Sequence, residues 1–91
     1  MNINYLFESK KENLMLSIGV IIISNEPLTQ ICYFDLNEYK KALKNGKEDL
    51  LDYVELNGTS EVDIYDKNEF INQLKQYNKK YKYVGIIDYD N

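Results

Sequence analysis

Two short segments of the chain carry polar side chains of the same types at the same spacing. Asp35–Lys44 and Asp66–Lys75 both read Asp-x-Asn-Glu-aromatic-x-x-x-Leu-Lys, and their first positions are 31 residues apart. Carboxylate and amide oxygens this close together could hold a hard cation. Neither copy has the alternating acids and the glycine of a calcium-binding loop. An aspartate followed three residues later by a glutamate is also typical of a helix start, so we predict two helix N-caps rather than a duplicated metal site.

Cys32 is the only cysteine of the chain. A catalytic thiol needs a neighbour that lowers its pKa, and the chain has no histidine to provide one. Cys32 lies between Ile31 and Tyr33 in a strand-like run, which indicates a packed core thiol. The fifteen acids include no pair whose spacing marks the two carboxylates of a glycosidase. We therefore predict no catalytic residues.

The absence of histidine and arginine narrows the possible functions further, since all eleven positive side chains are lysines. Without histidine the chain lacks the commonest zinc ligand and the commonest general base at neutral pH. Without arginine it lacks the bidentate group that binds phosphates and guanine edges. The net charge of −4 also argues against direct binding of nucleic acid. We expect a non-enzymatic protein with no metal and no cofactor.

The length and the apolar runs indicate one domain over residues 1–91 that does not enter a membrane. A chain of this size forms a single core. No run approaches the roughly 18 apolar residues of a membrane span. The opening Met1-Asn2-Ile3-Asn4 lacks the charged and apolar regions of a signal peptide, and one cysteine cannot form an internal disulfide. These features predict a cytoplasmic protein.

The first third of the chain reads as strands. Leu14–Ser24 has apolar residues on both faces of an alternating strand, which predicts a central place in a sheet. Ser17 and Gly19 thin one of these faces and indicate a bulge or a close approach of another segment. Thr29–Phe34 is the predicted returning strand. Residues 1–13 fit either a strand or a helical stripe, and we favour the strand.

The two Asp-x-x-Glu segments begin the predicted helices. The first helix runs from Asp35 to a stop at Gly46, and the second from Asp66 to about Lys79, each with an apolar stripe at helical spacing. Tyr83–Tyr89 closes the chain as a last strand.

The segment Lys47–Leu56 allows two interpretations. Leu50, Leu51 and Val54 suit a helix. Asn57-Gly58 is a strong hairpin signal when strand-like runs flank it. We favour the hairpin.

These elements predict an α+β fold, a two-layer sandwich of a mainly antiparallel sheet of about five strands with two helices. The order is ββα-ββα-β, with a further strand at the N-terminus. The 31-residue repeat relates residues 20–46 to residues 51–79, and an internal duplication or a coincidence of helix-start chemistry explains it equally. Two short helices would cover one face of the sheet, so a homodimer through the other face or through the edge of the last strand is expected as one way to bury it.

The charge distribution points to a binding surface. From Glu48 to Asp66 there are seven acids and no lysine. In the predicted hairpin, alternation puts acidic and tyrosine side chains on one outer face. Such a face would attract a basic protein partner, although a plain solvated face has the same pattern. The predicted protein-binding residues are Tyr53, Glu55, Glu61, Asp63 and Tyr65.

Several of these features together resemble a known class of proteins. In its size, its Asn/Lys/Ile/Tyr-rich composition, its Met1-Asn2-Ile3-Asn4 opening and its acidic segment Glu48–Asp66, the chain resembles the small acidic proteins that bacteriophages and mobile elements use against host defence, anti-CRISPR proteins among them. No alignable motif accompanies the resemblance, so no site residue is carried over.

The resemblance implies inhibition by occupancy in the host cell cytoplasm. An acidic face would fill a basic nucleic-acid channel of a defence nuclease, or block one of its conformational steps. A small self-associating structural protein and an immunity-type partner of a toxin are the alternatives.

Overall fold

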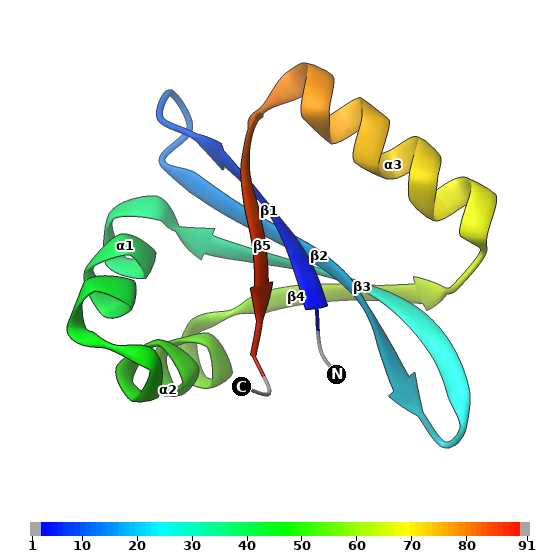
Figure 1. The fold of residues 1–91 in the computed structure, drawn as a ribbon, viewed down its shortest axis with the longest axis horizontal. Coiled ribbons are helices and arrows are strands. Elements are labelled where there is room, and N and C mark those ends of the chain that lie inside the picture. The colour runs from blue at the N-terminus through cyan, green and yellow to red at the C-terminus, as the bar shows by residue number, and fades with distance from the viewer. Residues whose placement is uncertain (1–2, 90–91) are drawn as a thin grey trace.

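The computed structural model describes residues 3–89 and has the α+β fold that the sequence predicts (Figure 1). The strands are β1 (Ile3–Ser9), β2 (Leu14–Ile23), β3 (Glu26–Asp35), β4 (Thr59–Ile64) and β5 (Lys82–Asp88). The helices are α1 (Leu36–Asn45), α2 (Lys47–Asn57) and α3 (Lys67–Lys80). The favoured N-terminal strand, the two Asp-initiated helices and the last strand are therefore confirmed.

The five strands form one sheet in the order β4-β3-β2-β1-β5, with every neighbouring pair antiparallel. The predicted central position of β2 is confirmed. β2 and β3 are joined at Ser24 and Asn25, whose φ angles of 52° and 67° are those of a tight two-residue hairpin turn.

One face of the sheet is covered by α1 and α2. Leu6 and Met15 of the sheet pack with Leu36 and Tyr39 of α1 and with Leu50 of α2. We call this the α1–α2 face.

The opposite face is covered by α3. Phe7 and Leu16 follow Leu6 and Met15 in sequence, so their side chains point to this opposite face. Together with Ile31 of β3 they pack with Phe70 of α3. We call this the α3 face, and Figure 1 shows α3 and the α1–α2 pair at opposite sides of the sheet. The expected pair of helices in a two-layer sandwich is therefore corrected to three helices on two faces. The expectation of a homodimer assumed that both predicted helices cover the same face, whereas α1 and α3 pack on opposite faces.

The predicted hairpin at Asn57-Gly58 is wrong, because residues 47–57 form α2. Leu50 is completely buried against the sheet, and Val54, one turn later, packs beside it. Gly58 has a φ of −77°, outside the left-handed region that a type I′ turn requires. Its small size matters instead, since a Cβ there would lie 2.8 Å from Cε1 of Phe34.

The repeated Asp-x-Asn-Glu segments are helix caps, as predicted. A carboxylate oxygen of Asp35 accepts the N–H of Glu38 at 2.9 Å, and one of Asp66 accepts the N–H of Glu69 at 3.0 Å. The ββα form is not repeated, because residues 51–57 are helical where the first copy has a strand. What the two copies share is a strand followed by an Asp-capped helix.

Candidate functional site

The structure separates the five residues that the sequence predicts as one protein-binding face. Tyr53 and Glu55 lie on α2, Glu61 and Asp63 lie on β4, and Tyr65 follows β4. Their grouping on one face requires residues 52–56 to form a strand. Because this segment is helical, alternation along a hairpin does not relate them.

Both tyrosines of the predicted face belong to the two cores. The Tyr53 ring packs 5.9 Å from that of Phe34 on the α1–α2 face, and burial and the nearby Glu38 carboxylate raise its pKa. The Tyr65 ring packs 5.8 Å from that of Phe70 on the α3 face. The acids are the members of the set whose side chains are exposed.

Glu61 and Asp63 share the α3 face of β4. They pair with Ile31 and Thr29, and Ile31 packs in the core beneath α3. The Tyr33 hydroxyl donates to a carboxylate oxygen of Glu61 at 3.4 Å. Burial, followed by the neighbouring Tyr77 and Glu61, raises the pKa of Tyr33 to about 12, so it stays a neutral donor at physiological pH. This contact holds the Glu61 carboxylate beside the sheet.

β4 forms an open edge of the sheet, since it pairs with β3 and with no second strand in the described part of the chain. All six of its residues are exposed. Tyr65 N–H donates to the Pro27 carbonyl at 3.3 Å, so Tyr65 directs its backbone groups toward β3. The alternation of an antiparallel ladder then directs Asp63 and Glu61 toward β3 as well.

The residues between them, Ser60, Val62 and Ile64, consequently direct their backbone groups away from the sheet. One of these outward groups already has a partner within β4, because the N–H of Ile64 donates to Oδ1 of Asp63 at 2.8 Å. The side chains of Val62 and Ile64 lie on the α1–α2 face and are 50% and 77% exposed. The edge of β4 therefore combines outward backbone groups, two acids on one face and two aliphatic side chains on the other.

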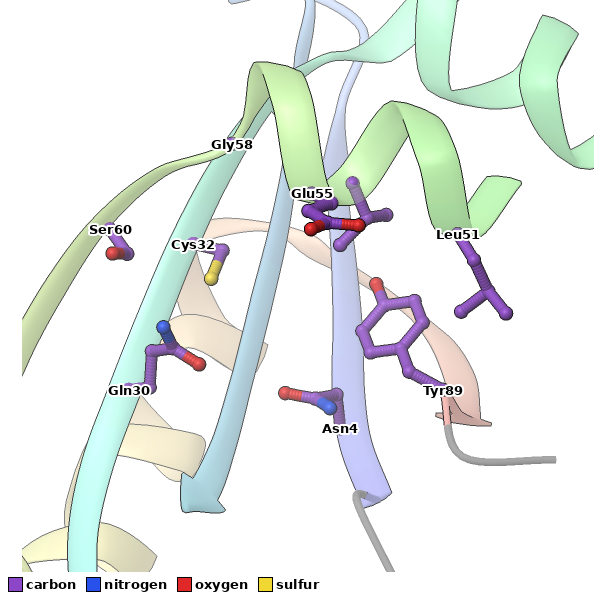
Figure 2. A pocket seen from close by; sticks show the side chains of 9 residues that line it. Asn4, Gln30, Cys32, Leu51, Glu55, Gly58, Ser60 and Tyr89 are labelled. Carbon is purple, nitrogen blue, oxygen red and sulfur yellow. The ribbon is translucent and has the colours of Figure 1, made fainter. Parts of the chain in front are cut away.

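A pocket of about 500 Å³ lies next to β4 on the α1–α2 face (Figure 2). α2 forms one wall with Leu51 and Val54. The polar groups that line the pocket are the side chains of Asn4, Gln30, Cys32, Glu55, Ser60 and Tyr89. Figure 2 shows the amides of Asn4 and Gln30 pointing toward one another over the sheet. Glu55 thus belongs to this pocket rather than to the surface of Glu61 and Asp63.

Gly19 lies on β2 between two of the residues that line the pocket. This residue pairs with Asn4 on one side and with Gln30 on the other. A Cβ at Gly19 would collide with the Asn4 amide and would lie 2.8 Å from the Ile3 carbonyl oxygen. Of the two features predicted at Ser17 and Gly19, a bulge or a close approach, the structure shows the close approach, at Gly19. Gly19 was the one signal in the sequence for this pocket, and Asn4, Gln30, Ser60 and Tyr89 were not foreseen as its lining.

The thiol and the phenol of the pocket stay protonated at neutral pH. Burial raises the pKa of the Cys32 thiol and that of the Tyr89 hydroxyl. The Tyr89 hydroxyl also lies 3.0 Å from the hydroxyl of Tyr39. Because the thiolate is the reactive form of cysteine, these groups are suited to hydrogen bonding rather than to nucleophilic attack.

Within residues 3–89, no three His, Cys, Asp or Glu side chains are arranged to hold a metal ion. None of the helices in the described part of the chain is long and apolar enough to cross a membrane. Comparison of the chain with protein-family models, with curated proteins and with solved structures found no match.

Proposed function

We propose that this protein is a non-enzymatic protein-binding inhibitor that uses the acidic edge strand β4 to occupy a basic surface of another protein. One observation carries the proposal. Every residue of β4 is exposed at the edge of the sheet, and the strand presents Glu61 and Asp63 on one face, in a stretch from Glu48 to Asp66 that has no lysine. Complementary charge across an interface favours association and selects the partner.

The partner that this surface fits best is a protein with a basic channel for nucleic acid. Such channels hold lysine and arginine to neutralise phosphates, and carboxylates on a protein surface can bind the same cations. The resemblance to small acidic phage proteins is in accord with this role. The proposal therefore places the protein in the host cell cytoplasm, where it prevents a defence nuclease from binding nucleic acid.

Competition with nucleic acid tests the proposal. Purified RNA-guided defence nucleases are incubated with the protein, and binding of fluorescent target DNA is followed by anisotropy. The wild-type protein should release DNA from a sensitive nuclease. The double variant Glu61→Lys/Asp63→Lys should need at least about tenfold more protein for the same release, since it replaces two attractive contacts by repulsive ones.

The matched control is Glu12→Lys/Glu26→Lys, which changes the net charge by the same amount at exposed positions outside β4 and outside the Glu48–Asp66 stretch. This variant should compete as well as the wild type. The proposal is wrong if both double variants lose activity to the same extent, because net charge alone would then explain the effect. Full activity of the β4 variant would contradict it as well.

A further inference from the structure

We propose that the partner binds by strand addition: an extended segment of the partner pairs with the outer edge of β4 as a sixth strand. The segment carries lysine or arginine at alternate positions, facing Glu61 and Asp63, and aliphatic residues between them, facing Val62 and Ile64. This assignment rests on the proposed function, to which it adds the binding mode and the sequence pattern of the partner.

The backbone of β4 has outward-directed N–H and C=O groups with which an added strand can pair. Its outward groups belong to Ser60, Val62 and Ile64. Of these, the N–H of Ile64 donates to the Asp63 carboxylate within β4. The N–H and C=O groups of Ser60 and Val62 thus form a two-residue template along the edge. Extended peptides use templates of this kind when they add a strand to a sheet.

The other edge of the sheet is less suitable. β5 has a register shift opposite Leu6 and Phe7, and its Gly85 has a φ of 139°. A bulge of this kind twists an edge and interrupts the regular spacing of its backbone groups. β4 pairs with β3 without any such shift over its whole length. The regular edge is therefore also the acidic one.

The α3 face of β4 offers a place for a basic side chain. A cavity of about 190 Å³ lies between β4 and α3, lined by Glu61, Asp63, Thr29 and Gln73 among others. Two carboxylates and an amide oxygen at one small cavity suit an ammonium or guanidinium group, which offers several donors. The cation of an added strand would enter this cavity from the open side of β4.

The α1–α2 face of β4 suits apolar side chains of the partner. Val62 and Ile64 stand exposed there, and Ile64 pairs with the partly buried Leu28 of β3. Aliphatic side chains from an added strand would extend this small apolar surface by cross-strand contacts. An extended segment alternates its side chains between the two faces, so one pattern of alternating basic and aliphatic residues satisfies both.

A second copy of this chain fits the edge poorly. If β4 paired with β4 of another copy, Glu61 and Asp63 of each would face acids of the other, and like charges directly opposite one another are destabilising. The acids thus disfavour self-pairing at the same edge that they open to a basic segment.

The test uses the full chain and a synthetic probe, the acetylated and amidated peptide Lys-Val-Lys-Val-Lys-Val-Lys, with affinity measured by calorimetry. A peptide of the same composition in the order Lys-Lys-Lys-Val-Val-Val-Lys is the control. Two further versions carry N-methyl groups on the valine amides or on the lysine amides. The alternating peptide should bind at least about tenfold more tightly than the reordered one, because only it matches both faces.

Methylation tests strand pairing independently of charge. In an antiparallel strand beside β4, residues opposite Val62 exchange hydrogen bonds with it, and these are the valines of the peptide. Methylated valine amides should therefore weaken binding at least about tenfold, whereas methylated lysine amides should leave it within about twofold. Equal effects of the two methylation patterns overturn strand addition. Absence of any binding by the alternating peptide overturns it too.

A protein variant provides the matching test on the other side. Val62→Pro removes an outward N–H and leaves the bonds to β3 in place, a position at which edge strands tolerate proline. It should fold as the wild type does, by circular dichroism, and bind the alternating peptide at least about tenfold more weakly. Unchanged binding by a folded variant overturns strand addition.

These outcomes separate the binding mode from the proposed function. If the peptide binds equally in both methylated forms and Glu61→Lys/Asp63→Lys abolishes that binding, the acidic surface stands and strand addition falls. A mass of the free protein that rises with concentration, and falls back when the peptide is added, would assign the edge to a second copy and also overturn the proposal.

Discussion

At the scale of single residues, Asp35 and Asp66 show how the same cap can have different importance in two places. Each accepts a backbone N–H in the first turn of its helix. Asp35 has a second partner, because its Oδ2 accepts a hydrogen bond from the Asn13 side chain at 2.6 Å. This bond connects the start of α1 to the turn between β1 and β2, whereas Asp66 acts within its own helix start.

The two caps should therefore respond differently to the same substitution. Asp66→Ala should lower the free energy of unfolding by about 1 kcal/mol, the usual effect of losing an N-cap. Asp35→Ala should lower the free energy of unfolding by up to about 1 kcal/mol more than Asp66→Ala does, because it also removes the hydrogen-bond acceptor of the Asn13 side chain. Urea denaturation of both variants measures the difference. Asn13→Gly is the control, because Asn13 has a φ of 52° that glycine adopts without strain, and in the Asp35→Ala background it should have almost no further effect. Equal losses for the two aspartates would contradict this account.

At the scale of elements, α2 connects the acidic segment to the core. One side of this helix carries Leu50, which is completely buried, and the other side carries Leu56, which is 81% exposed. A hairpin in the same segment would instead have turned Leu56 toward the core. The two leucines therefore distinguish the helix from the hairpin.

Alanine substitutions at these two positions should have very different effects. Leu50→Ala should destabilise the protein by about 2–5 kcal/mol, the range for truncating a buried leucine. Leu56→Ala should change the free energy of unfolding by less than about 0.5 kcal/mol, as expected at an exposed site. Thermal and urea unfolding give both values. A large loss at Leu56 with little change at Leu50 would support the hairpin instead.

The elements that the sequence predicts well are those fixed by local chemistry. Alternating apolar residues identify β2 as the central strand, and the Asp-x-x-Glu pattern marks where α1 and α3 begin. α2 is missed because the Asn57-Gly58 pair is typical of a hairpin turn and also suits the end of a helix. Its glycine serves the contact with Phe34, which is 24 residues away in the chain and cannot be inferred from neighbours in sequence.

Two members of the predicted protein-binding face stay together in the structure, and their role in binding stays a prediction. Glu61 and Asp63 lie on one face of a strand, as alternation requires, and both are exposed. Tyr53 and Tyr65 pack into opposite cores, which depends on α2 being a helix and on α3 crossing to the other face. The edge position of β4 follows from strand order, and strand order is a tertiary property that no local pattern reports.

At the scale of the whole molecule, helices on both faces leave the two edge strands as the open sides of the sheet. β5 is interrupted by a register shift, and β4 is regular, exposed and acidic. Lysines lie on all three helices, on β5 and in the turn after β1, and β4 has none. β4 is therefore the one regular edge of the described sheet whose charge is complementary to a basic segment of a partner.

Hydrogen exchange at β4 tests this account most directly. In the free protein, the amides of Ser60 and Val62 should exchange rapidly and those of Glu61 and Asp63 slowly, because only the second pair faces β3. A saturating amount of the alternating lysine–valine peptide should slow exchange at Ser60 and Val62 by at least about tenfold, since the added strand accepts their hydrogen bonds. Exchange at Ser60 and Val62 that stays as fast with bound peptide as without it would contradict the account.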